Sequence, residues 1–152
     1  MPAQHAYVPD MNQLMTAEEL LSTNVPNKRT ELVRGRLIVH EPPGGRHGYI
    51  AANLAFQLNQ HIDQPIPNTY LEFAPDLVVE VLSHNDRPGE VLAKVGDWLD
   101  AGARLVWVVD PERRLARVYR EDGTEYMLNE TAQLLGEDVL PGFSCTLASI
   151  LG

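Results

Sequence analysis

Two carboxylates stand in a stretch of sequence that otherwise has the apolar character of a buried β-strand. The stretch reads "APDLVVEVLS", and its acids are Asp76 and Glu80. Because side chains alternate along an extended strand, two acids four positions apart are predicted to lie on the same face. An ionised carboxylate among apolar side chains is costly unless a cation, a hydrogen bond or a metal ion compensates it. Glu80 therefore requires a cationic partner close by.

Lys94 is the candidate for that partner. It lies on the helix predicted to follow the strand, to one side of the apolar stripe, so its flexible stem can reach along the sheet edge toward Glu80. A glutamate beside a lysine is half of a metal-dependent site for phosphodiester hydrolysis: the carboxylate holds Mg²⁺ and the ammonium orients water or stabilises developing charge. The alternative is an ordinary, partly buried ion pair that tethers the helix to the sheet.

A strand-helix-strand unit must position these residues. The first strand is predicted over 77–83 and the second over "RLVWVVD", and both are apolar enough to be covered on two faces. Between them a helix is predicted from Pro88 to a stop at Gly102. Its apolar stripe comprises Val91, Leu92, Val95, Trp98 and Leu99. Trp98 is interpreted as a core residue, and an aromatic platform for nucleic-acid bases is the lesser alternative.

Further elements are predicted on both sides of this unit. Thr16 and Glu19 form a capping box that opens a short helix, and "ELVRGRLIVH" predicts either two strands turning at Arg34 and Gly35 or one strand with a bulge. A longer helix is predicted over about 47–61. Its core face comprises Ile50, Leu54, Leu58 and Ile62, at four-residue spacing. Downstream, "LARVYR" and "EYMLN" are predicted strands, and a short amphipathic helix ends the chain.

These elements predict a mixed sheet flanked by helices, so the fold class is α/β or α+β. With 152 residues, 44% of them hydrophobic, one globular domain is expected over 16–152, preceded by an N-terminal tail over 1–15. A signal sequence and an apolar run of about 20 residues are both lacking, and a lone Cys145 excludes an intramolecular disulfide. A soluble, cytoplasmic protein that does not enter a membrane is therefore expected.

The net charge of −9 argues mildly against a polyanionic partner. Two local groups of cations, in contrast, favour a polyanionic partner. They comprise Lys28, Arg29, Arg34 and Arg36 near the start, and Arg113, Arg114, Arg117 and Arg120 later in the chain. Solvated faces of hairpins are the preferred interpretation of both groups, and a track for phosphates is the alternative.

Several blocks, taken in order over about 16–151, resemble the Uma-two family, which is grouped with the restriction endonucleases in the PD-(D/E)XK nuclease superfamily. They are "ELVRGRLIVHEPPGGRHGYIAANLAFQLNQHI", "APDLVVEVLSHNDR", Lys94, "DWLDAGARLVWVVDP" and "LPGF". The resemblance implies a restriction-endonuclease-like core and cleavage of DNA that depends on Mg²⁺ or Mn²⁺. It implies that the active-site lysine has moved from the position of Leu82 to Lys94, and that Glu31 matches the N-terminal family acid.

One family feature is missing. Members usually carry extra strands with another Pro-Asp between the long helix and the "PDLVVEV" strand, whereas here "PIPNTY" leads almost directly into it. Asp76 is a weak substitute, because four strand residues place it about 13 Å from Glu80, too far to share one Mg²⁺. The expected metal ligands are therefore Glu80, with Glu31 or a partner chain as helper and Asp76 as the weakest choice.

The alternative function is a shortened, catalytically degenerate paralogue that acts as a binding or oligomerising module. In that case Asp76 simply marks the start of a strand and Glu31 faces solvent. The oligomeric state is open between monomer and homodimer, because nucleases that cut both strands often work as dimers and a chain without inner strands exposes a sheet edge.

Overall fold

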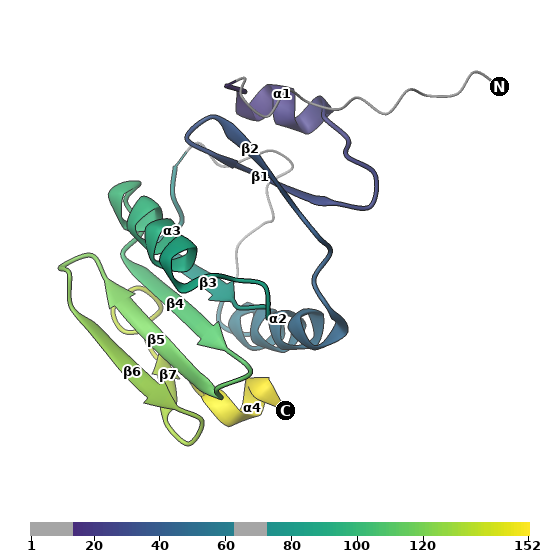
Figure 1. The fold of residues 1–152 in the computed structure, drawn as a ribbon. Coiled ribbons are helices and arrows are strands. Elements are labelled where there is room, and N and C mark those ends of the chain that lie inside the picture. Colours follow the sequence, from purple (N-terminus) through teal and green to yellow (C-terminus); the bar gives the residue numbers. More distant parts are fainter. Residues whose placement is uncertain (1–13, 63–72) are drawn as a thin grey trace. The chain divides into compact units, whose positions relative to one another are not determined.

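The computed structural model describes residues 14–62 and 73–152 (Figure 1). These residues fall into two compact units that divide between Pro43 and Gly44. Most of the predicted N-terminal tail, and the segment 63–72 where the family's extra strands would be inserted, lie outside the described residues. A single domain over 16–152 stays a prediction. None of the helices in the described ranges has the length and apolar character needed to span a bilayer.

The first unit begins with the predicted capping box. Helix α1 (Ala17–Ser22) follows Thr16, whose hydroxyl accepts a hydrogen bond from the Glu19 amide at 3.2 Å. In return the Thr16 amide donates to the Glu19 carboxylate at 2.8 Å. Both exposed donors at the helix start are thereby satisfied, which confirms the prediction.

A two-stranded hairpin completes the first unit. Strands β1 (Arg29–Val33) and β2 (Arg36–His40) pair antiparallel, with Glu31 opposite Ile38. The two turn residues both have positive φ, 51° at Arg34 and 78° at Gly35. Two successive left-handed residues suit the twist of a tight hairpin, so the sequence forms two strands and not one bulged strand.

The second unit is built on a four-stranded mixed sheet of order β3-β4-β5-β6. Its strands are β3 (Leu77–Val81), β4 (Leu105–Asp110), β5 (Leu115–Arg120) and β6 (Glu125–Asn129). Strands β3 and β4 are parallel and joined by helix α3 (Pro88–Asp100), whereas the other pairs are antiparallel. This arrangement confirms the predicted mixed sheet with flanking helices and makes the fold α+β.

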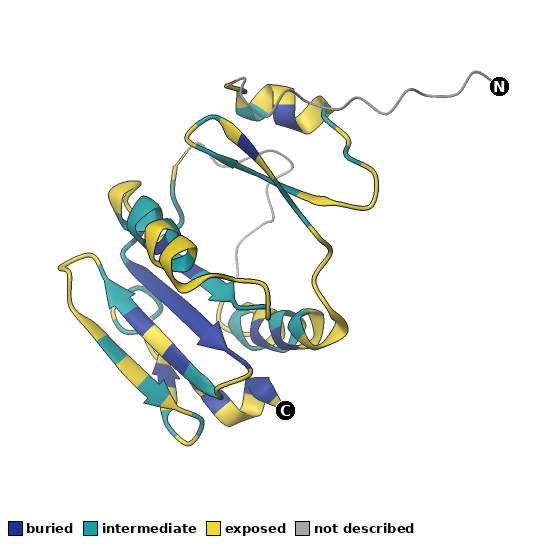
Figure 2. Cartoon of the chain, viewed as in Figure 1, coloured by how far each residue is buried: buried dark blue, intermediate teal, exposed yellow. Residues whose placement is uncertain are grey.

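Helices cover both faces of the sheet (Figure 1). Helix α3 packs on one face, over a buried cluster centred on Val78, Val95 and Val106. Helices α2 (Gly45–Asn59) and α4 (Leu147–Leu151) pack on the other face, over a larger cluster around Trp107. Strand β4 lies between the two clusters and is buried at every position (Figure 2). Because helices cover both faces of β4, its sequence "LVWVVD" lacks the alternation of polar and apolar residues found in half-exposed strands.

Two predicted core positions are wrong. Leu92 is 58% exposed, because it lies at the border of the α3 stripe while Val91, Val95 and Trp98 face the sheet. Ile62 is 40% exposed, because α2 ends at Asn59 and the helical spacing that directs side chains to the core does not extend to Ile62. The remaining apolar residues of both stripes are buried or partly buried, as the periodicity indicates.

A short antiparallel pair near the C-terminus was not predicted. Strands β7 (Gln133–Leu135) and β8 (Ser144–Thr146) pair with Leu134 opposite Cys145. Both of these residues are buried in the larger cluster. Three residues are too few to show the period-two alternation from which strands are recognised.

The thiol of Cys145 is expected to be unreactive in the folded protein. It is 6% exposed, and burial raises its pKa from 9.0 to about 11. Only the thiolate is nucleophilic, so alkylation by iodoacetamide at pH 8 should be at least about a hundredfold slower in the native state than in guanidinium chloride. Because the chain has one cysteine, mass spectrometry reads the label unambiguously. Equal rates in the two states would contradict the buried β8 position.

Candidate active site

Glu80 lies on the face of the sheet that α3 covers. Its neighbour at two-residue spacing, Val78, belongs to the cluster under α3, whereas Val79 and Val81 pack toward the opposite cluster. Strand pairing places Glu80 beside Val108 of β4, which is also part of the α3-side cluster. The alternation predicted for this strand is therefore confirmed, and the acid is directed into the layer between sheet and helix.

Lys94 makes the predicted contact. Its ammonium Nζ lies 3.2 Å from Oε1 and 3.3 Å from Oε2 of Glu80. The side chains of Lys94 and Glu80 are 26% and 21% exposed, so water reaches only part of the ion pair. An ion pair in this setting gains from reduced screening, and because it is not fully buried it avoids the full cost of desolvation.

Trp98 is a second donor to the same carboxylate. Its indole N–H donates to Glu80 Oε1 at 3.1 Å. Sequence reasoning assigned Trp98 to the core, and its ring does pack against the α3-side cluster. The signal that could have found its polar contact is spacing: Trp98 follows Lys94 by four residues, so both lie on the same side of α3. A helix side that brings Lys94 to Glu80 brings Trp98 there too.

Asp76 lies just before β3 and is exposed. Its carbonyl oxygen accepts the amide N–H groups of Arg104 and Leu105, each at 3.0 Å, where the pairing of β3 with β4 begins. This backbone role agrees with the interpretation that Asp76 marks the start of the strand. The four-residue separation from Glu80, about 13 Å in an extended strand, places the two carboxylates too far apart for one ion.

Glu31 lies on β1 in the first unit, whereas Glu80 and Lys94 belong to the second. Its carboxylate lies 3.5 Å from Arg29 Nη2 and 3.4 Å from His40 Nε2, and its side chain is 25% exposed. Glu31 therefore contacts Arg29 and His40 within its own hairpin. Its contribution to the site of Glu80 stays a prediction.

The carboxylate of Glu80 fits Mg²⁺ or Mn²⁺ in the kind of donor that it offers. These ions take oxygen ligands, and Mg²⁺ is commonly bound through one or two carboxylates, with water and substrate phosphates completing the shell. Across residues 14–62 and 73–152, no three side chains of His, Cys, Asp or Glu gather to hold a metal. A divalent ion beside Glu80 would therefore have to take most of its other ligands from water or substrate oxygens.

The two cationic groups singled out in the sequence are largely engaged in local ion pairs. Five of these cations pair with nearby acids: Lys28 with Glu41, Arg29 with Glu31, Arg113 with Asp110, Arg114 with Glu130 and Arg120 with Glu137. The exposed pairs among them contribute little to stability, but every pair offsets the positive charge locally. The hairpin interpretation of these cations is favoured over a continuous phosphate track.

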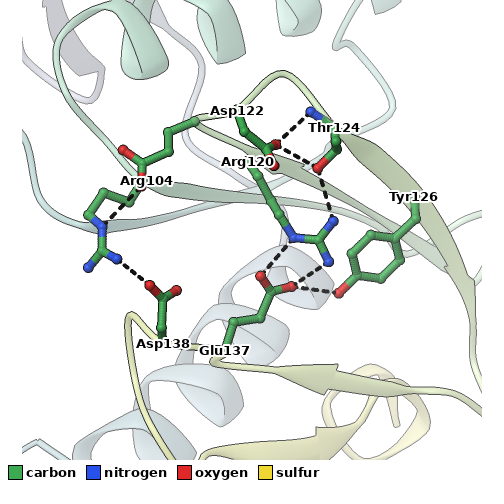
Figure 3. A network of polar contacts seen from close by, with 8 residues as sticks. Arg104, Arg120, Asp122, Thr124, Tyr126, Glu137 and Asp138 are labelled. Carbon is green, nitrogen blue, oxygen red and sulfur yellow. Dashed lines mark hydrogen bonds and ion pairs between the residues drawn. The ribbon is translucent and has the colours of Figure 1, made fainter.

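A separate polar network surrounds Glu137, which follows β7 (Figure 3). Arg120 donates to both carboxylate oxygens, at 2.7 and 2.9 Å, and the Tyr126 hydroxyl donates at 3.1 Å. Burial and the bond to Glu137 raise the pKa of Tyr126. Because Arg120 pairs with Leu105 and Tyr126 with Val118, both in or beside the Trp107 cluster, this network lies on the opposite sheet face from Glu80.

Comparison with solved structures supports the fold. A crystal structure of a "putative nuclease belonging to DUF820" from Anabaena variabilis ATCC 29413 superposes with a TM-score of 0.73 at 18% sequence identity. The alignment covers 90% of this chain and 97% of that one. At this identity the likeness concerns the fold. A search of curated proteins found no match.

Comparison with family models gives a more specific result. Residues 62–148, more than half of the chain, match the family Uma2, described as "Putative restriction endonuclease". The matched range includes the strand that bears Glu80 and the helix that bears both of its donors, whereas Glu31 lies outside it. The chain belongs to the Uma2 family.

Proposed function

We propose that this protein is an endonuclease that hydrolyses DNA phosphodiester bonds with the help of Mg²⁺ or Mn²⁺, and that Glu80 and Lys94 form its reactive pair. The observation that carries the proposal is the 3.2 Å contact between the Lys94 ammonium and the Glu80 carboxylate, on a sheet face inside the family-matched range. Membership of a family described as restriction endonucleases makes DNA the substrate to test first.

The two side chains have complementary roles in this proposal. The carboxylate of Glu80 offers oxygen atoms to a cation, and Lys94 is a flexible side chain that ends in three N–H donors. The ammonium can hold the attacking water or stabilise charge that develops on the phosphate oxygens. A divalent ion bound beside Glu80 would polarise the phosphate and lower the pKa of water. Partial exposure of the pair leaves it open to substrate.

Additional metal ligands are proposed as well. Glu31 is the preferred second acid, and a carboxylate from a second copy in a homodimer is the alternative. Asp76 is the weakest candidate, because its position just before β3 is about 13 Å along the strand from Glu80. A cytoplasmic location is proposed as well, since a free buried thiol at Cys145 suits a reducing compartment.

A second function is favoured by one specific observation. Among the described residues, both donors to Glu80 come from α3, so these contacts also hold the helix against β3 without any chemistry. Together with the lack of a three-ligand metal cluster among the described residues, this fits a binding or oligomerising module that has kept the family fold. If the wild-type protein neither binds metal nor nicks DNA, the result would support this second function.

Replacing Glu80 with Gln is expected to abolish Mg²⁺ binding and the nicking of supercoiled plasmid. The amide keeps the size of the side chain but removes the charge that attracts the ion, so the loss should be at least about 10²-fold in rate. Calorimetric titration with Mg²⁺ and Mn²⁺ and agarose-gel nicking assays measure the two effects. The matched control is Glu137→Gln, which alters a carboxylate of similar exposure on the other sheet face. A Glu80→Gln variant that nicks like the wild type would refute the proposal.

A further inference from the structure

We infer that Trp98 is a positioning residue that holds Oε1 of Glu80 and so orients the carboxylate for the cation that it binds. The inference rests on the proposed function for the nature of that cation. The geometry behind the inference does not depend on the proposed function. The indole N–H of Trp98 contacts Oε1 at 3.1 Å, and the ammonium of Lys94 lies within 3.3 Å of both oxygens.

The two oxygens of Glu80 are not equivalent. Oε1 accepts the Trp98 indole N–H at 3.1 Å, whereas Oε2 accepts the Lys94 ammonium at 3.3 Å. The ammonium also lies 3.2 Å from Oε1 as an ion-pair contact. An ionised carboxylate has about four lone-pair sites, two on each oxygen. Each oxygen therefore accepts one hydrogen bond from α3 and keeps a site for a cation or a water molecule.

Trp98 is suited to orienting the acid and not to transferring protons. An indole donates one N–H, accepts nothing and carries no charge. Its ring is half-buried against the cluster under α3, so its position is set by packing. Lys94, by contrast, has a long flexible stem whose ammonium can leave the carboxylate during a reaction. If it does so, the indole contact is what keeps the carboxylate oriented.

The Glu137 network provides a matched comparison within the same chain (Figure 3). There too a carboxylate is held by one cation and one neutral aromatic donor, Arg120 and Tyr126, and the aromatic contact has the same length of 3.1 Å. Tyr126→Phe removes a donor from Glu137 in the same way as Trp98→Phe removes one from Glu80. Because the two networks lie on opposite faces of the sheet, only Trp98→Phe should affect the proposed site.

The hydrogen bond can be tested without metal or DNA. The chain has two tryptophans, so a ¹H–¹⁵N spectrum contains two indole N–H resonances. Glu80→Gln replaces a charged acceptor by a weaker neutral one, so the Trp98 resonance is expected to move upfield. The Trp107 indole is buried with no hydrogen-bond partner in the described residues, so its resonance should not move. A Trp98 resonance that stays in place would overturn the inference.

The effect on function is tested with Trp98→Phe. Mutation of groups that orient a metal ligand typically costs 10–100-fold in metal affinity or activity, so Mg²⁺ affinity by calorimetry and nicking rate should both fall by roughly this factor. Tyr126→Phe should leave both unchanged. Wild-type affinity and rate in Trp98→Phe would overturn the inference.

The two arms separate failure of the inference from failure of the proposed function. If the wild type neither binds Mg²⁺ nor nicks DNA, the proposed function fails, and the indole resonance still decides whether Trp98 orients Glu80. Loss of packing is also separable, because the spectrum of Glu80→Gln leaves Trp98 itself unaltered. A shifted Trp98 resonance in that spectrum supports positioning even if Trp98→Phe is too unstable to assay.

Discussion

Replacing Lys94 with Ala is expected to slow Mg²⁺-dependent nicking of DNA by roughly 10²–10³-fold while leaving the affinity for Mg²⁺ nearly intact. The ammonium is the group proposed to orient water or stabilise charge in the transition state, so its loss falls on the rate. It is not a metal ligand, and its removal takes a positive charge away from Glu80, which lies 3.2 Å away. Calorimetry for Mg²⁺ and single-turnover nicking assays measure the two quantities separately.

The chain offers a natural control for this change. Its other lysine, Lys28, is paired with Glu41 in the first unit. Lys28→Ala also removes one ammonium from a carboxylate but is expected to leave both rate and metal affinity unaltered. If Lys94→Ala loses metal affinity and rate equally, the lysine acts on binding, and the role assigned to it is wrong. If Lys28→Ala slows nicking as much, the effect is one of net charge.

The middle of the fold could be predicted because its physical causes are local. A seven-residue run that is apolar except at Glu80 and Ser83, a helix with an apolar stripe and a second apolar run indicate a parallel pair with a crossover helix. Elements β3, α3 and β4 follow this pattern. The strands β7 and β8 could not be predicted in this way. Each has three residues, and they are held by pairing with each other and by burial of Leu134 and Cys145, which depend on tertiary contacts.

The candidate site was predictable only in part. The cost of an unpaired acid in a buried strand points to a cation on the next helix, and the contact between Glu80 and Lys94 confirms this reasoning. The cost of burying the acid predicts one cationic partner and says nothing of further donors, although a carboxylate accepts several hydrogen bonds. Trp98 was assigned to the core from its apolar spacing, because a tryptophan presents both an apolar ring and a polar N–H and periodicity registers only the ring.

A site of this kind depends on the sheet that holds it, so losses of activity must be distinguished from losses of structure. Leu134→Ala is expected to destabilise the protein by about 2–5 kcal/mol, the usual cost of truncating a buried leucine. Leu134 is fully buried on β7, whereas the adjacent Leu135 is 45% exposed. Leu135→Ala should therefore change the free energy of unfolding by only about 0.5 kcal/mol. Equilibrium unfolding in guanidinium chloride measures both values.

The comparison of these two leucines also tests the register of β7 on β8. Side chains of a strand alternate, so a slip of one residue would exchange the faces of Leu134 and Leu135. A larger loss for Leu135→Ala than for Leu134→Ala would show that Cys145 does not lie opposite Leu134. With the observed register, Leu134→Ala weakens the core on the face away from Glu80. Mg²⁺ affinity and nicking should then be retained at temperatures where the variant is folded, which would separate support of the sheet from the chemistry proposed on its other face.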